Sequence, residues 1–148
     1  MAIRQLTHFD DIRFRKKSKP VAKFDEKLWE LLDDMLDTLK RVKGYGCAAV
    51  HVGVLKRVVL VLDNDKPIEL INPVIVAMSA EKEKIFEGSI APNAPAGYVE
   101  RPRKVTVEAS DRCGKPTIIK AEGFLAATLC HEIDHLDGVL FSDKIIKE

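Results

Sequence analysis

Two histidines and a glutamate near the end of the chain have the spacing of a metal site. The segment CHEIDHLDG covers residues 130–138, so His131 and His135 lie four positions apart and Glu132 directly follows the first histidine. On an α-helix, residues four apart lie on the same face, and both imidazoles can therefore bind one ion. Glu132 can then remove a proton from a water molecule bound to that ion. The sequence predicts a hydrolytic metal site of the H-E-x-x-H type.

A third protein ligand must come from upstream, because the 13 residues after His135 contain neither histidine nor cysteine. The upstream candidates are carboxylates, two histidines and three cysteines: His8, His51, Cys47, Cys113 and Cys130. Neutral imidazole suits Fe²⁺, Zn²⁺, Ni²⁺ and Co²⁺ about equally, so the pattern predicts one divalent ion without selecting it. We expect Asp134 and Asp137 to orient the two histidines through hydrogen bonds.

The elements that position these residues can be predicted from periodicity. Residues 24–43 repeat apolar side chains at helical spacing after Asp25, a helix N-cap type, and residues 123–136 form a second helix that carries the histidines. Strand-like segments lie between them: 57–62, 68–71, 74–79, 84–88, 105–110 and 117–122, with a break at residues 72–73 and a hairpin turn at 111–116. One helix, a block of strands and one late helix predict an α+β fold. The length predicts a single domain over residues 1–148.

Charge and cysteine content exclude several classes of protein. The formal net charge is +1, and the densest basic run, residues 13–19, is interpreted as a solvated surface, with a patch that contacts RNA or the ribosome as the alternative. No DNA partner is expected. No segment is long and apolar enough to suggest a membrane span. Three cysteines do not make a disulfide framework, and they favour a reducing cytoplasm.

Four segments resemble the peptide deformylase family in order and spacing. They are GYGCAAVHVGV at 44–54, LINPVI at 70–75, EGSIA at 87–91 and HEIDHLDGVLF at 131–141. The resemblance implies an H-E-x-x-H helix cradled by antiparallel strands. It also implies an enzyme that hydrolyses the N-formyl group of nascent peptides. The expected substrate is a formyl-methionyl peptide or another formylated amine, with contact to the nascent chain at the ribosome as a further expectation.

The resemblance also implies roles for individual residues. His131 and His135 bind the metal, Glu132 acts as general base, and the backbone N–H of Ile90 holds the formyl oxygen. Gly46, Glu87 and Gly88 belong to the substrate cleft. The methionine pocket is formed by five residues: Tyr45, Ile85, Phe124, Ala127 and Thr128.

Two positions depart from the family pattern, and both correspond to residues of the family's active site. Ser89 stands where the family has its cysteine ligand, and His51 stands where the family has a glutamine that donates a hydrogen bond to substrate. A neutral hydroxyl binds metal more weakly than a thiolate. His51 can therefore be the third metal ligand in a three-histidine site, or a hydrogen-bond donor in the glutamine's place. Ser89 as a weak direct ligand is the third hypothesis.

The departures leave other functions open. A paralogue without catalytic activity could keep the cleft and bind peptides, and Ser89 is the feature that motivates this alternative. A small metalloprotease is a further class, which the missing downstream ligand disfavours. Residues 92–103, PNAPAGYVERPR, are interpreted as a loop rich in proline and alanine that could alter the choice of substrate.

Overall fold

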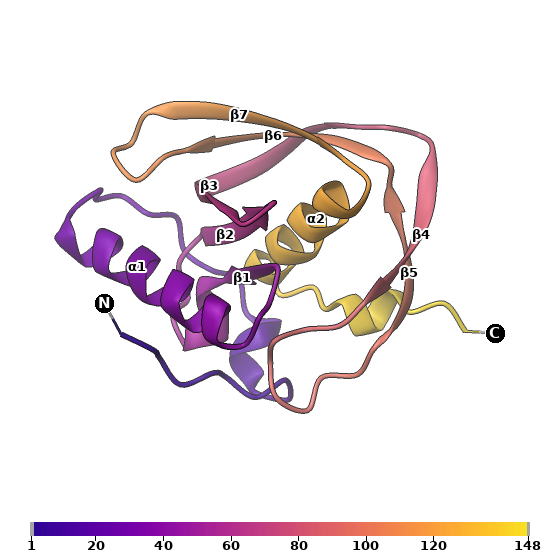
Figure 1. The fold of residues 1–148 in the computed structure, drawn as a ribbon, viewed down its shortest axis with the longest axis horizontal. Coiled ribbons are helices and arrows are strands. Elements are labelled where there is room, and N and C mark those ends of the chain that lie inside the picture. The colour runs from indigo at the N-terminus through magenta and orange to yellow at the C-terminus, as the bar shows by residue number, and fades with distance from the viewer. Residues whose placement is uncertain (1, 148) are drawn as a thin grey trace.

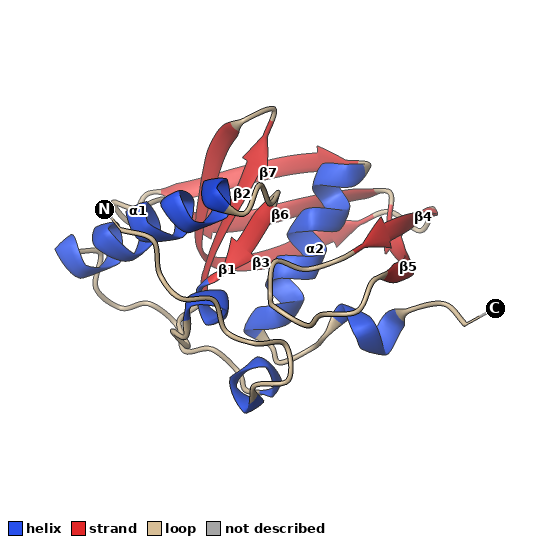
Figure 2. Cartoon of the chain, turned by 60° about the horizontal axis from the view of Figure 1, so that its bottom comes forward, coloured by secondary structure: helices blue, strands red, loops and turns tan. Residues whose placement is uncertain are grey.

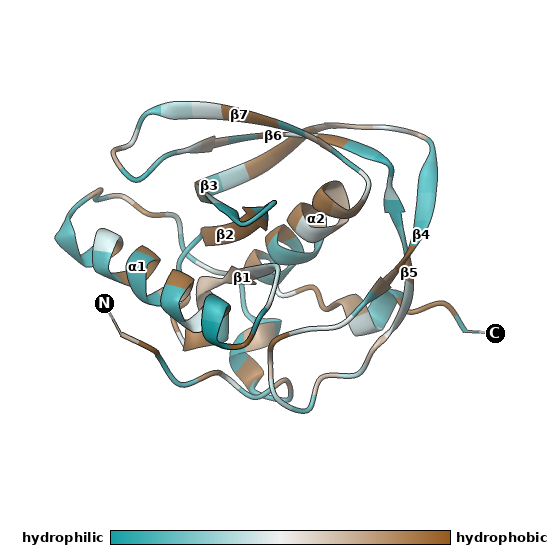
Figure 3. Ribbon diagram, viewed as in Figure 1, coloured by the Kyte–Doolittle hydropathy of each residue, from teal (hydrophilic) through white to brown (hydrophobic). Residues whose placement is uncertain are grey.

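The first long helix forms where the apolar periodicity placed it. The computed structural model describes residues 2–147, and α1 covers Glu26–Arg41. The Asp25 side chain caps the helix by accepting a hydrogen bond from the Leu28 N–H at 3.3 Å. Apolar and polar residues alternate along the helix (Figure 3), and its apolar stripe is buried.

Two antiparallel sheets make up the β part of the molecule (Figures 1 and 2). The larger sheet has the order β1-β2-β3-β6-β7, with β1 at Gly46–Ala48, β2 at Val58–Asp63, β3 at Lys66–Met78, β6 at Lys104–Ser110 and β7 at Pro116–Glu122. The smaller sheet pairs β4 (Lys82–Glu87) with β5 (Gly97–Pro102). Three short 3₁₀ helices lie outside the sheets, η1 at Ile12–Arg15, η2 at Ala49–Val52 and η3 at Phe141–Lys144.

The expected break at residues 72–73 is wrong, because β3 is one continuous strand whose register with β6 shifts between Ile71 and Val74. Asn72 adopts a positive φ of 53°, a conformation that asparagine tolerates better than most residues. Its amide side chain pairs with the backbone of Val21, accepting from the N–H at 2.8 Å and donating to the carbonyl at 3.0 Å. Long-range hydrogen bonds to Val21 therefore hold the strand through an asparagine-proline pair that normally ends one.

The interpretation of residues 92–103 as a loop is correct only for the first half of the segment. Residues 97–102 form β5, in register with β4 so that Phe86 faces Tyr98 and Glu87 faces Gly97. Val99 and Arg101 alternate inward along β5 and are buried. The pairing partner lies ten or more residues upstream, so the strand was not visible in the local composition.

Strand β2 separates two buried clusters because successive side chains point to opposite faces. Val59 and Val61 pack with residues of the second helix, α2 (Phe124–Leu136), whereas Val58 and Leu60 pack with α1. The two helices therefore lie on opposite sides of the larger sheet (Figure 1). Helix α2 also contacts β5, which places it between the two sheets. No helix among residues 2–147 has the length and apolar content needed to cross a membrane.

Candidate active site

The inner face of α2 brings the H-E-x-x-H residues together as the spacing predicts. His131, Glu132 and His135 are all buried, with exposed fractions of 6 %, 5 % and 0 %. The Nε2 atoms of the two histidines lie only 3.2 Å apart. A pair of imidazoles this close, on one helix face, points its nitrogens at a shared position.

His131 is held by a buried chain of charged groups. Its Nδ1 lies 2.8 Å from Oε1 of Glu87, and Arg101 donates to both oxygens of that carboxylate at 2.7 and 2.8 Å. Burial opposes the charge on Glu87, but the hydrogen bonds from Arg101 and His131 hold its pKa at about 2. An ionised Glu87 keeps a proton on Nδ1 of His131, so the lone pair of the neutral ring lies on Nε2.

His135 is positioned by aromatic packing. Its Nδ1 is buried and has no hydrogen-bond partner among the described residues. Its ring lies 5.3 Å from Phe14 and 4.8 Å from His51, measured between ring centroids. His131 in turn stacks on Phe141 at 4.9 Å. Aromatic rings therefore restrict the orientation of both histidines of the H-E-x-x-H segment.

The donor set fits a divalent cation. Burial lowers the pKa of His135 well below its usual value of 6.5, so this ring stays neutral. Two nitrogen ligands on one tetrahedral ion are about 3.4 Å apart, close to the observed separation of 3.2 Å. A cation shared by the two Nε2 lone pairs satisfies atoms that otherwise face each other in a buried space.

Glu132 lies beside these rings with part of its carboxylate unpartnered. Its Oε1 is buried and makes no hydrogen bond with the described residues, and burial raises its pKa to about 7. Gly46 of β1 approaches it closely, because a Cβ at this position would lie 2.9 Å from Cγ2 of Thr128 and 3.2 Å from Oε2 of Glu132. The glycine keeps the space in front of the carboxylate open.

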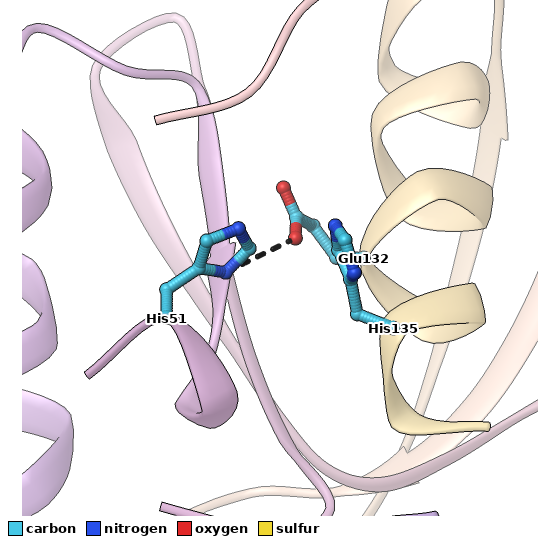
Figure 4. Close-up of side chains that lie close together, drawn as sticks. All are labelled: His51, Glu132 and His135. Carbon is cyan, nitrogen blue, oxygen red and sulfur yellow. Dashed lines mark ion pairs between the residues drawn. The ribbon is translucent and has the colours of Figure 1, made fainter. Parts of the chain in front are cut away.

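His51 reaches the same place from η2, opposite Glu132 and His135 (Figure 4). Its Nδ1 lies 3.0 Å from the Ala48 nitrogen and 3.2 Å from the Ala48 carbonyl oxygen, so one tautomer accepts from the Ala48 N–H and the other donates to the carbonyl. Burial, with a contribution from His131, lowers its pKa to about 3. Nε2 lies 3.4 Å from Oγ of Ser89, and that oxygen also accepts from the Ala91 N–H at 3.1 Å.

His51, Glu132 and His135 also form a second group with metal-ligating potential. One ligand atom from each lies within 4.8 Å of the others, and all three residues are buried. The distance from Nδ1 of His51 to Oε1 of Glu132 is 3.8 Å, shown dashed in Figure 4. The structure therefore brings the two departures from the family pattern, His51 and Ser89, into direct contact at the site.

A cavity of about 500 Å³ opens in front of these groups. Its walls are residues 42–46, the segment from Ile85 to Ile90, and the face of α2 from Phe124 to Glu132. These walls include every residue that sequence reasoning placed in the substrate cleft or methionine pocket: Tyr45, Gly46, Ile85, Glu87, Gly88, Phe124, Ala127 and Thr128. Ser89 and Ile90 line it too, whereas His51 and His135 do not belong to its walls.

The expectation that Asp134 and Asp137 orient the histidines is wrong. Asp134 accepts from Arg101 at 2.9 Å and from Lys144 at 3.1 Å, and Asp137 pairs with Arg57 at 3.0 Å. Sequence reasoning missed Arg101, Phe14 and Phe141, which hold the site in place. Only Glu87 of the second motif could have indicated a buried cationic partner, because an ionised carboxylate is rarely buried without one.

A buried H-E-x-x-H helix with converging imidazoles, set beside a cavity and an unpartnered glutamate, defines a metal-dependent hydrolase. The sequence model of the family described as Polypeptide deformylase matches residues 3–148. Peptide deformylase of Caldicellulosiruptor bescii is 48% identical over 99% of this chain and 88% of its own length. Peptide deformylase of Alkaliphilus metalliredigens is 45% identical, with 100% of both chains covered.

Solved structures of peptide deformylases are also similar to this fold. The crystal structure of peptide deformylase from Thermotoga maritima has a TM-score of 0.95 and 32% identity, covering 99% of this chain and 100% of that one. Peptide deformylase from Ehrlichia chaffeensis in complex with actinonin has a TM-score of 0.94 and 36% identity, covering 99% and 91%. The chain belongs to the peptide deformylase family. It is a metal-dependent hydrolase that removes N-formyl groups from peptides, and the predicted α+β fold is confirmed.

Proposed function

We propose that His131 and His135 hold one divalent ion and that Glu132 is the general base of deformylation. The observation that carries this assignment is the 3.2 Å approach of the two Nε2 atoms beside the unpartnered Oε1 of Glu132. When bound, the ion polarises the formyl oxygen and makes a water molecule more acidic. Glu132 takes the proton of the attacking water and delivers it to the leaving amine.

We propose that His51 donates a hydrogen bond to the formyl oxygen. In the tautomer whose Nδ1 accepts from the Ala48 N–H, the proton lies on Nε2, which is 3.4 Å from Oγ of Ser89 at the edge of the cavity. The backbone N–H of Ile90 also makes no hydrogen bond with the described residues, although it borders the cavity. Two donors on one side of the carbonyl stabilise the negative charge that develops on its oxygen.

Ser89 is proposed as a weak third ligand in the position of the family cysteine. The Ser89 hydroxyl oxygen accepts from the Ala91 N–H and faces Nε2 of His51. If His51 donates from Nε2, these two contacts occupy both lone pairs of the neutral hydroxyl. Direct ligation therefore requires loss of the hydroxyl proton, and we expect weaker metal binding than a thiolate gives. Imidazole and oxygen ligands suit Fe²⁺, Zn²⁺, Ni²⁺ and Co²⁺, and metal analysis of the purified protein selects among them.

The proposed substrate is a formyl-methionyl peptide bound in an extended conformation. Strand β1 lies at one end of the larger sheet, and β4 pairs on one edge only with a described strand, β5. Both free edges border the cavity, at Gly46 and at Ile85–Gly88, so an added strand can hydrogen-bond between them. The methionine side chain would enter the inner pocket between Ile85 and α2.

The cellular setting is inferred from fewer features. The three cysteines are free, which favours a reducing compartment such as the cytoplasm. We propose that residues 1–148 act as one domain, because both buried clusters share strand β2. The formylated end of a nascent chain at the ribosome is the proposed substrate in the cell, and co-sedimentation with ribosomes tests that association.

The experiment that tests the proposed function is formate release from formyl-Met-Ala by protein loaded anaerobically with each of the four ions. We expect one bound ion per chain and turnover with at least one of the metals. Glu132→Gln should keep the ion and lose about 100-fold or more of kcat, since it removes the proton acceptor. If the protein binds metal but releases no formate from any formylated peptide, the assignment is contradicted. If it releases formate only from small formylated amines, those amines are the substrate class instead.

A further inference from the structure

Two aromatic side chains lie on the outer face of the β4–β5 pair, next to the mouth of the cavity. Phe86 and Tyr98 face each other across the strands, and their rings meet edge to face with centroids 5.1 Å apart. Both are unusually exposed for large aromatic residues, at 58 % and 50 %. Phe86 also borders the cavity in which the substrate is proposed to bind. An exposed apolar patch that continues a binding cavity commonly contacts a ligand.

The alternation of side chains along β4 separates this patch from the catalytic side. Glu87 points inward, because its carboxylate contacts His131, and Ile85 shares that face. Phe86 lies between them and points outward, as its exposure shows. In β5 the same alternation buries Val99 and leaves Tyr98 outside.

A peptide added to the free edge of β4 must follow the same alternation, because neighbouring strands place their side chains on common faces. The methionine side chain occupies the inner face with Ile85. The side chain of the next residue therefore lies on the outer face, within cross-strand reach of Phe86. The third residue points inward again.

We propose that Phe86, packed against Tyr98, binds the side chain of the residue that follows formyl-methionine and selects for an apolar or aromatic side chain there. On the outer face of β4 and β5, Lys84 lies opposite Glu100, next to the aromatic pair. The two aromatic rings therefore form the apolar part of this face. This inference depends on the proposed function, because it assumes that the peptide binds along β4.

The test compares two series of peptides by kcat/KM for formate release. In formyl-Met-X-Ala, with X as Phe, Leu, Ser or Asp, we expect Phe to be preferred over Ser by about three- to tenfold. Phe86→Ser should reduce this ratio to near one, and Phe86→Tyr should restore it. In formyl-Met-Ala-X, where the variable side chain points inward, Phe86→Ser should leave the order of preference unchanged.

Ile118→Ser is the matched control, because Ile118 is an exposed apolar residue on β7 that does not border the cavity. It should preserve the preference in both series. Turnover of all peptides with no preference at the second residue, or a preference that Phe86→Ser leaves intact, overturns this inference alone. Absence of formate from every peptide overturns the proposed function together with it.

Discussion

Oε1 of Glu87 lies 2.8 Å from Nδ1 of His131, and the same oxygen accepts a hydrogen bond from Nη2 of Arg101 at 2.8 Å. A residue of the second motif thus fixes the tautomer of a histidine in the third motif, while an arginine from β5 keeps the carboxylate ionised. The orientation of His131, a proposed metal ligand, therefore depends on three elements that are distant in the sequence.

Glu87→Gln should weaken metal binding about 10- to 100-fold, because a neutral amide holds the Nδ1 proton of His131 less firmly and leaves Arg101 poorly paired. Competition with a chelator, at constant pH, measures the affinity. Glu83→Gln is the matched control on the same strand, since Glu83 is partly exposed and pairs with Arg103. Equal affinities of the two variants would mean that Glu87 does not act through His131.

Ser89→Cys should raise metal affinity by about tenfold or more, because a thiolate is a charged ligand and forms readily beside a divalent cation. Ser89→Ala should lower affinity, because it removes the oxygen that is proposed as the third ligand, and an unchanged affinity would contradict that role. Isothermal titration with Zn²⁺ on chelator-treated protein distinguishes these results. A cysteine variant that binds no more tightly would show that residue 89 does not reach the ion.

His51→Ala should reduce kcat by about 100-fold while leaving the metal content unchanged, because it removes a donor to the formyl oxygen and no ligand. His51→Gln should recover most of the activity, since an amide N–H can replace the Nε2 donor. Metal content and formate release are measured on the same samples. A fall in bound metal in the alanine variant would instead support the three-histidine site.

The pH dependence of stability follows from the buried Glu132. In the metal-free protein burial raises its pKa from 4.5 to about 7, so the folded state holds this proton more tightly than the unfolded state does. The contribution of Glu132 is therefore fully present below pH 4.5, and it is lost as pH rises through the folded pKa. Glu132→Gln removes this loss, and we expect roughly 2 to 3 kcal/mol more stability than the parent at pH 8.

Urea unfolding in the presence of a chelator, at pH 5 and pH 8, measures the difference for Glu132→Gln. The advantage of the variant should be smaller at pH 5. It should also shrink when Zn²⁺ is added, because a bound cation favours the ionised carboxylate of the parent. A difference that is the same at both pH values would show that the carboxyl is not held neutral in the metal-free fold.

The sequence alone determined the two helices and the metal motif, because both depend on short-range spacing. Residues four apart share a helix face in any context, so their spacing is enough to pair His131 with His135. The apolar stripe of residues 24–43 predicted α1 for the same reason. The motif resemblance also located most of the cavity wall, including Tyr45, Phe124 and Thr128.

Only the tertiary structure decided how the site is supported and completed. Arg101 lies 14 residues from Glu87 and 33 from Asp134, and no periodicity predicts that the three meet in a buried ion-pair group. The backbone of Ala48 holds Nδ1 of His51, and the contact between His51 and Ser89 spans 38 residues. Such relationships arise from strand pairing and packing between distant segments, which local composition does not encode.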